Sequence, residues 1–130
     1  MITKTFISYS FADRNQYKSF DRQLREFLES NFSMKTHSLV FDLKEKVNNK
    51  TLMELAFKKI NECDLILIEL SHKSIGVGIE AGYAKAKGKR IIYMHKIGTE
   101  LSTTADGICD SRIEYKNISD LLTKLKKILQ

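Results

Sequence analysis

The chain has 130 residues, of which 42% are hydrophobic, and a formal net charge of +6, so we expect one domain over residues 1–130 with a buried core. No apolar run reaches about 18 residues, the first residues lack signal-peptide anatomy, and the scattered lysines form no aromatic-interleaved stripe. These features predict a cytoplasmic protein that binds neither membrane nor nucleic acid. Cys63, Cys109 and three lone histidines share no ligand spacing, so we expect reduced cysteines and no metal site.

Apolar residues in the first half of the chain predict two strands and two helices. The strands are expected at residues 5–8 and 38–42, and the first helix at residues 13–31 with Asp13 as its cap. A polar loop over residues 43–50 leads to a second helix. The apolar stripe of that helix is Leu52, Leu55, Ala56 and Ile60.

The second half continues the same alternation. The predicted strands are residues 65–70, 90–94 and 112–115, and a helix that includes residues 81–87 ends at Gly88. A loop is expected over residues 96–110. The last helix carries an apolar stripe made of Leu121, Leu122, Leu125, Ile128 and Leu129.

Strands that alternate with helices predict an α/β fold in which helices cover both faces of a parallel sheet. Five strands in about this length favour a flavodoxin-like three-layer fold with strand order 2-1-3-4-5. The carboxyl edge of such a sheet is where ligands bind.

The segment SHKSIGVGIE, residues 71–80, is the most informative part of the chain. It is predicted as a small-residue loop that leaves the carboxyl end of the third strand, with Glu80 in the first turns of the following helix. It lacks the GxxxxGK[ST] and complete GxGxxG patterns, so neither a nucleoside triphosphate, a Rossmann-bound dinucleotide nor another cofactor is expected. Glu80 is therefore a candidate catalytic acid, although a glutamate here could also complement the helix dipole.

Hydroxyls and glycines gather on the loops after strands one, three and four, and such groups commonly hold phosphates or sugars. Each has a structural alternative: Ser74 could simply cap the helix, and Tyr9 could be an ordinary strand-end aromatic. The candidates for substrate binding are Ser8, Tyr9, Ser10, Ser74, Gly76, Gly78 and Ser102.

Residues 62–84, ECDLILIELSHKSIGVGIEAGYA, closely resemble the signature of the nucleoside 2-deoxyribosyltransferase family, which includes nucleoside 5′-monophosphate N-glycosidases. The resemblance implies that Glu80 is the catalytic glutamate and that Ser74 contacts a phosphate. Residues 101–107 resemble a later loop of the family whose serine reaches the phosphate in a neighbouring subunit's site. Ser102 falls on that serine, which implies a homodimer with shared sites.

The chain also departs from the family pattern. Family members usually carry an aspartate eight residues before the position of Asp64, where this chain has Ala56, and Lys73 replaces a frequent proline. Residues 6–13, FISYSFAD, resemble the first strand and loop of TIR domains, some of which cleave NAD.

The resemblance implies an enzyme that cleaves the N-glycosidic bond of a nucleoside or nucleoside 5′-monophosphate, or transfers the deoxyribosyl group, with a carboxylate nucleophile. A TIR-like NAD hydrolase and a noncatalytic nucleotide sensor or interaction module remain alternatives.

Overall fold

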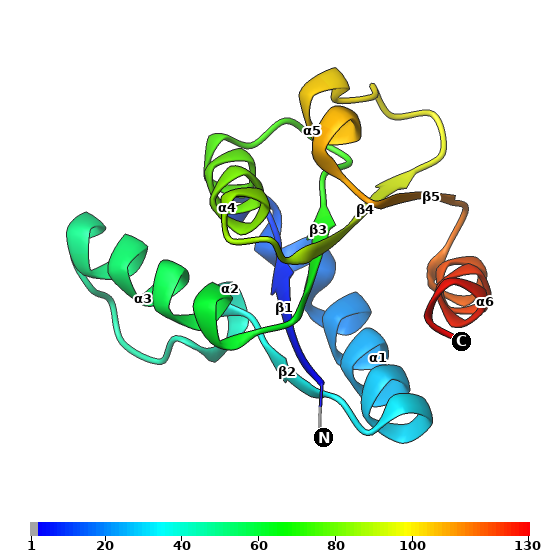
Figure 1. Cartoon of the computed structure of the whole chain (residues 1–130), viewed down its shortest axis with the longest axis horizontal. Coiled ribbons are helices and arrows are strands. Elements are labelled where there is room, and N and C mark those ends of the chain that lie inside the picture. The colour runs from blue at the N-terminus through cyan, green and yellow to red at the C-terminus, as the bar shows by residue number, and fades with distance from the viewer. Residues whose placement is uncertain (1–2) are drawn as a thin grey trace.

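The structure is a computed structural model that describes residues 3–130, so the first two residues of the expected domain lie outside the described residues. Strands and helices alternate along the chain (Figure 1). The strands are β1 (Lys4–Ser8), β2 (Lys35–His37), β3 (Leu65–Glu69), β4 (Arg90–Lys96) and β5 (Ser111–Tyr115). The helices are α1 (Arg14–Phe32), α2 (Leu39–Asp42), α3 (Asn49–Glu62), α4 (Ile75–Ala86), α5 (Thr103–Ile108) and α6 (Ile118–Leu129), with a 3-10 turn, η1, at Phe11–Asp13.

All five strands are parallel and follow the order β2-β1-β3-β4-β5, which confirms the predicted flavodoxin-like fold. Ser8 at the end of β1 pairs with Ile68 of β3, and Glu69 at the end of β3 pairs with Met94 of β4. The carboxyl ends of these three neighbouring strands therefore lie at one edge of the sheet.

Helices cover both faces of the sheet (Figure 1). On one face, α1 and α6 pack through Leu24 and Leu121, together with other leucines, against β1, β3, β4 and β5. On the other face, Ile60 of α3, Val77 of α4 and Ala105 of α5 belong to a second apolar cluster. The central strand is buried throughout, which explains why its sequence is an unbroken apolar run before the final glutamate.

The predicted second strand over residues 38–42 is wrong, because β2 ends at His37 and the next residues form the short helix α2. Asp42 turns back on this segment: its carboxylate accepts the Ser38 backbone N–H at 2.9 Å and an Arg25 N–H at 2.7 Å. Arg25 comes from α1. A short apolar run such as residues 38–42 is compatible with a strand or a helix, and these contacts stabilise the helix.

Three helix boundaries also differ from the prediction. α4 begins at Ile75, so Gly76 and Gly78 are helical rather than part of a loop, because the Ser74 hydroxyl accepts the Val77 N–H at 3.3 Å and caps the helix. The predicted loop over residues 96–110 contains α5, and α3 begins at Asn49, within the predicted polar loop.

The sequence predicts that Gly88 ends the helix that includes residues 81–87. Gly88 has a φ of +70° just beyond α4, in agreement with its expected place at the helix end. Cys63 and Cys109 are free, and no helix within residues 3–130 is both long and apolar enough to cross a membrane.

Candidate active site

Glu80 and Ser8 meet at the carboxyl edge of the sheet. Glu80 projects from the second turn of α4, and Ser8 is the last residue of β1. The Ser8 hydroxyl donates to Oε1 of Glu80 over 2.6 Å, a length typical of charge-assisted O–H···O bonds. The two residues are 72 positions apart in the sequence, so the crossing of α4 over the sheet creates the pair.

Burial governs the acidity of Glu80. It raises the pKa of the Glu80 carboxyl from 4.5 to about 7, and the Ser8 hydrogen bond offsets part of that rise. Ala56, where the family pattern places an aspartate, is buried on α3 and supplies no second carboxylate. A carboxyl with a pKa near neutrality and one donor is a reasonable candidate for chemistry.

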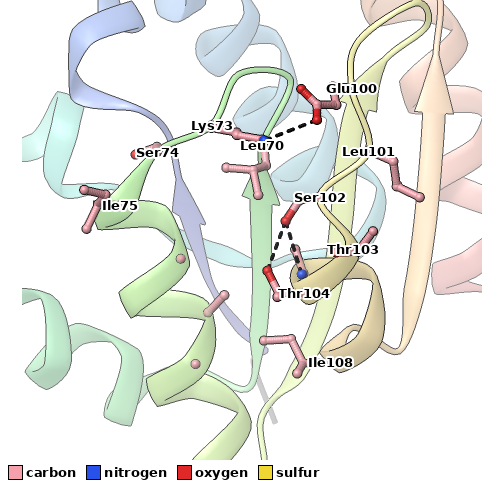
Figure 2. Close-up of a pocket in the computed structure, with 14 residues that line it drawn as sticks. Leu70, Lys73, Ser74, Ile75, Glu100, Leu101, Ser102, Thr103, Thr104 and Ile108 are labelled. Carbon is pink, nitrogen blue, oxygen red and sulfur yellow. Dashed lines mark hydrogen bonds and ion pairs between the residues drawn. The ribbon is translucent and has the colours of Figure 1, made fainter.

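The cavity beside α4 contains the predicted phosphate-binding serines. Its volume is about 620 Å³, and it lies between α4 and the loop that leads into α5 (Figure 2). Ser74 and Ser102 line it from opposite sides, and each hydroxyl accepts the backbone N–H three residues further on, at 3.3 Å. Lys73 and Glu100 form an ion pair of 3.2 Å between the two loops.

Glu80 does not line this cavity among the described residues. Its carboxyl bonds to β1, whereas the cavity lies on the side of α4 that faces α5 and includes Gly78 and Gly82. Ser74, at the start of α4, lines the cavity six residues before Glu80. Within one chain, Ser102 and the Glu80 carboxyl therefore lie on different sides of α4.

The other predicted site residues separate into two groups. Ser10 lies at the carboxyl edge, two residues beyond Ser8, where its carbonyl accepts the Asp13 N–H at 3.1 Å. Tyr9 packs in the core under α1, on the opposite face of the sheet from Glu80, and its hydroxyl donates to Asp21 at 2.7 Å. The alternation of side chains along a strand explains why neighbours Ser8 and Tyr9 diverge.

Three further side chains have partners that the sequence did not predict. Asp13 stands at the helix N-cap position but makes no capping bond, and its carboxylate lies 3.5 Å from His72. Tyr83, three residues after Glu80 on α4, donates to Asn61 at 3.0 Å. No cluster of three or more potential metal ligands occurs within residues 3–130.

Sequence reasoning missed the buried carboxylate of Glu69. It accepts the Tyr17 hydroxyl at 3.0 Å, the Ser71 N–H at 2.7 Å, and the Tyr115 hydroxyl. Glu69 is 2% exposed and faces α1 rather than α4. The available signal was an acidic residue at the end of an otherwise apolar buried strand.

Comparisons with known proteins show which proteins the chain as a whole resembles. No protein-family profile matches the chain. A protein of Syntrophotalea carbinolica named "Putative 2'-deoxynucleoside 5'-phosphate N-hydrolase 1" is 29% identical over 97% of this chain and 94% of its own length. The predicted resemblance to the nucleoside 2-deoxyribosyltransferase and N-glycosidase family is confirmed.

Two solved structures establish the fold independently. The CMP N-glycosidase of Clostridium botulinum has a TM-score of 0.76 at 23% identity and covers 97% of this chain and 99% of its own. A 2-deoxyribosyltransferase of Bacillus psychrosaccharolyticus has a TM-score of 0.71 at 12% identity and covers 92% and 90%.

Proposed function

We propose that this chain is an enzyme that cleaves the N-glycosidic bond of a nucleoside or nucleoside 5′-monophosphate, or transfers its deoxyribosyl group, with Glu80 as the catalytic carboxylate. The observation that carries the proposal is the Glu80–Ser8 pair at the carboxyl edge of the sheet, within the motif that resembles the family signature. The full-length similarity to the Syntrophotalea protein supports the same chemistry.

The chemistry needs one well-placed carboxylate. As the C1′–N bond breaks, its electron pair leaves with the base and positive charge builds on C1′. Ionised Glu80 attacks C1′ or stabilises that charge, and water or a second base then takes the sugar. The Ser8 hydroxyl orients the carboxylate by holding Oε1. Because the pKa of Glu80 is about 7, the reactive ionised form prevails only above neutral pH.

Hydrolysis of a 5′-monophosphate is the form of the reaction that we favour, because Ser74 and Ser102 offer hydroxyls for a phosphate. A hydrogen bond contributes about 0.5–1.5 kcal/mol, or more to a charged acceptor. Ser102→Ala is therefore expected to weaken a monophosphate several-fold to about tenfold and to leave the bare nucleoside unchanged. Equal loss for both would exclude the phosphate role.

A homodimer with shared sites would reconcile the separate positions of Glu80 and Ser102. The cavity side of α4 is suited to contact a second copy, because Ile75 is 85% exposed, Ile79 is 48% exposed, and the exposed Gly78 and Gly82 carry no side chains that would hold a partner away. In such a dimer, Ser102 of one subunit would serve Glu80 of the other.

Complementation tests the shared site. Mixing Glu80→Gln protein with a Ser102→Asp variant is expected to restore activity, because one hybrid site in each mixed dimer keeps both intact side chains. Aspartate preserves the α5 cap and repels a phosphate, so Ser102→Asp should remain folded. An active monomer without complementation would contradict the shared site.

A panel assay tests the function itself. The protein is incubated with nucleosides, their 5′-monophosphates and NAD, and free base is measured by chromatography. We expect base release that falls about 10³-fold or more in Glu80→Gln, which keeps the side-chain size and removes its charge. Release from NAD alone would favour the TIR-like hydrolase. Binding without release, consistent with Ala56 in place of the family aspartate, would favour a sensor.

A further inference from the structure

Two buried side chains of β4, Tyr93 and His95, lie beneath the loop that carries Ser102. Their ring centroids are 5.2 Å apart. The Tyr93 hydroxyl accepts the Ser102 backbone N–H at 2.9 Å, at the end of the loop. His95 holds the start of the loop, where its Nδ1 lies 3.2 Å from Oγ1 of Thr99. One strand therefore fixes both ends of the segment that positions Ser102.

The second ring nitrogen of His95 is connected to α5. Its Nε2 lies 3.0 Å from Nη1 of Arg112, and Nε of Arg112 lies 3.1 Å from Oδ1 of Asp106. The backbone N–H of Asp106 donates to the Ser102 carbonyl at 2.9 Å. A continuous path of polar contacts thus runs from His95 through Arg112 and Asp106 to Ser102.

The donors in this path define the protonation state of His95. Arg112 can only donate, so Nε2 must accept and the ring proton resides on Nδ1, where it points to Thr99. The Thr99 hydroxyl in turn donates to the Lys96 carbonyl at 2.6 Å. The contacts are complete only when His95 is neutral, because a proton on Nε2 would face the Arg112 guanidinium.

The surroundings of His95 favour the neutral form. His95 is 1% exposed, and burial lowers the pKa of His95 below 6.5, an effect that Arg112 reinforces. Three carboxylates raise the pKa in opposition. They are Glu114, whose Oε2 lies 3.9 Å from Nε2, Asp106 and Glu69, and they do not outweigh burial.

We propose that His95 is a positioning residue for Ser102: in its neutral form it holds Arg112 and α5 in place, and its protonation releases Arg112 and loosens the Ser102 turn. The proposal rests on the proposed phosphate role of Ser102 for its functional consequence. The enzyme would then lose affinity for a 5′-monophosphate, but not for the bare nucleoside, as His95 takes up a proton.

Hydrogen exchange tests the structural part without any need for activity. Protection of the Ser102 and Ala105 amides is measured by NMR at about pH 7.5 and about pH 5, a range that spans histidine titration. The Asp120 amide, which Asn117 caps at 2.9 Å in α6, is the internal reference. We expect Ser102 and Ala105 to lose several-fold to about tenfold protection on acidification relative to Asp120.

Two substitutions assign this change to His95. His95→Gln keeps an oxygen that can accept from Arg112 and does not titrate, so protection should remain high at both pH values. His95→Phe keeps a buried ring without polar atoms and should show low protection at both. Wild-type protection that is insensitive to pH, or the same acid loss in His95→Gln, would overturn the proposal. If His95→Phe does not fold, the comparison of wild type with His95→Gln decides.

Kinetics tests the functional part. The monophosphate itself titrates near pH 6, so the quantity measured is the ratio of wild-type KM to His95→Gln KM, which removes that effect. We expect this ratio to rise several-fold between about pH 7.5 and about pH 5.5 for a monophosphate and to stay within about twofold for a nucleoside. A rise of this KM ratio for both substrates, or for neither, would contradict the proposed effect of His95 on phosphate binding.

A matched control addresses general effects of a lost ion pair. Arg22→Gln removes the exposed Arg22–Glu26 pair of 4.0 Å on α1, which packs on the other face of the sheet from α5, and should change neither readout. If no base is released from any substrate, the proposed function fails while the exchange result still decides the role of His95. If exchange is unaffected in an active enzyme, only the positioning role fails.

Discussion

Buried Glu69 and half-buried Glu80 are two glutamates near the carboxyl edge of the sheet, and they differ in how their oxygens are used. Glu69 faces α1 and accepts three hydrogen bonds, from the hydroxyls of Tyr17 and Tyr115 and from the Ser71 N–H. Glu80 faces β1 and accepts one, from Ser8. The sheet separates the two environments.

The difference indicates which carboxylate stabilises the fold and which is available for chemistry. A buried carboxylate that accepts several hydrogen bonds is held rigidly, and its donors would be left unpaired if it were lost. A carboxylate with one donor is incompletely solvated, which is why burial raises the pKa of Glu80 to about 7. A developing cation on a bound sugar would supply the interaction that Glu80 lacks.

The largest expected effect on stability concerns Glu80. Its pKa of about 7, against 4.5 in the unfolded chain, means that the folded state binds more protons than the unfolded state between these values. Stability is therefore highest below about pH 4.5 on this account and falls as pH rises toward and through 7, by up to about 3 kcal/mol. Glu80→Gln lacks this penalty.

Urea unfolding of wild type and Glu80→Gln at a series of pH values measures this pH-dependent loss of stability. The variant should be more stable by up to about 3 kcal/mol at about pH 8, and the difference should shrink toward zero near pH 4. A constant difference across this range would mean that Glu80 is not buried in its charged form.

Glu69→Gln should destabilise the protein, in contrast to Glu80→Gln. The amide retains one acceptor oxygen but presents an NH₂ group to donors, so part of the network with Tyr17, Tyr115 and Ser71 is lost. We expect a loss of about 1–3 kcal/mol in the free energy of unfolding, measured in urea at neutral pH. The folded variant should still release base within about threefold of wild type, because Glu69 lies on the other face of the sheet.

The single substitutions Tyr17→Phe and Tyr115→Phe are the controls, since each removes one donor and leaves the Glu69 side chain in place. Each should cost less than Glu69→Gln if the carboxylate is the centre of the network. A stable Glu69→Gln protein with greatly reduced turnover would reverse the roles assigned to the two glutamates.

The strand order and four of the five strands were predictable from the sequence, because those strands carry strong local signals. β3 is an unbroken apolar run, and alternation with amphipathic helices predicts the parallel order. The error at residues 38–42 arose because Arg25, on α1, stabilises a helical turn through Asp42, and such a contact leaves no local pattern. The start of α4 was misplaced because Gly76 and Gly78 suggested a loop, whereas the Ser74 cap starts the helix there.

The candidate site was predictable in part. The motif singled out Glu80, and loop position singled out Ser8, but their contact depends on the crossing of α4 over β1. To predict the surroundings of Tyr9 and Glu69, one must know which face of the sheet each side chain points to. A fully buried strand does not reveal this, because it lacks alternation of apolar and polar residues. His95 was a lone histidine in the sequence, and its partners Thr99 and Arg112 come from a loop and a neighbouring strand.

The smallest predicted effect concerns the one hydrogen bond that Glu80 accepts. Ser8→Ala removes the donor that lowers the pKa of Glu80, so that pKa should rise above 7 and the acid limb of kcat/KM for a bare nucleoside should move to higher pH. Using a nucleoside avoids titration of a phosphate, and ¹³C NMR of the Glu80 carboxyl gives the same quantity without turnover. Ser8→Thr retains a hydroxyl and should restore the wild-type profile. The 2.6 Å hydrogen bond is the contact through which Ser8 would act on Glu80. An unchanged Glu80 pKa in Ser8→Ala would therefore mean that Ser8 does not control the charge of Glu80.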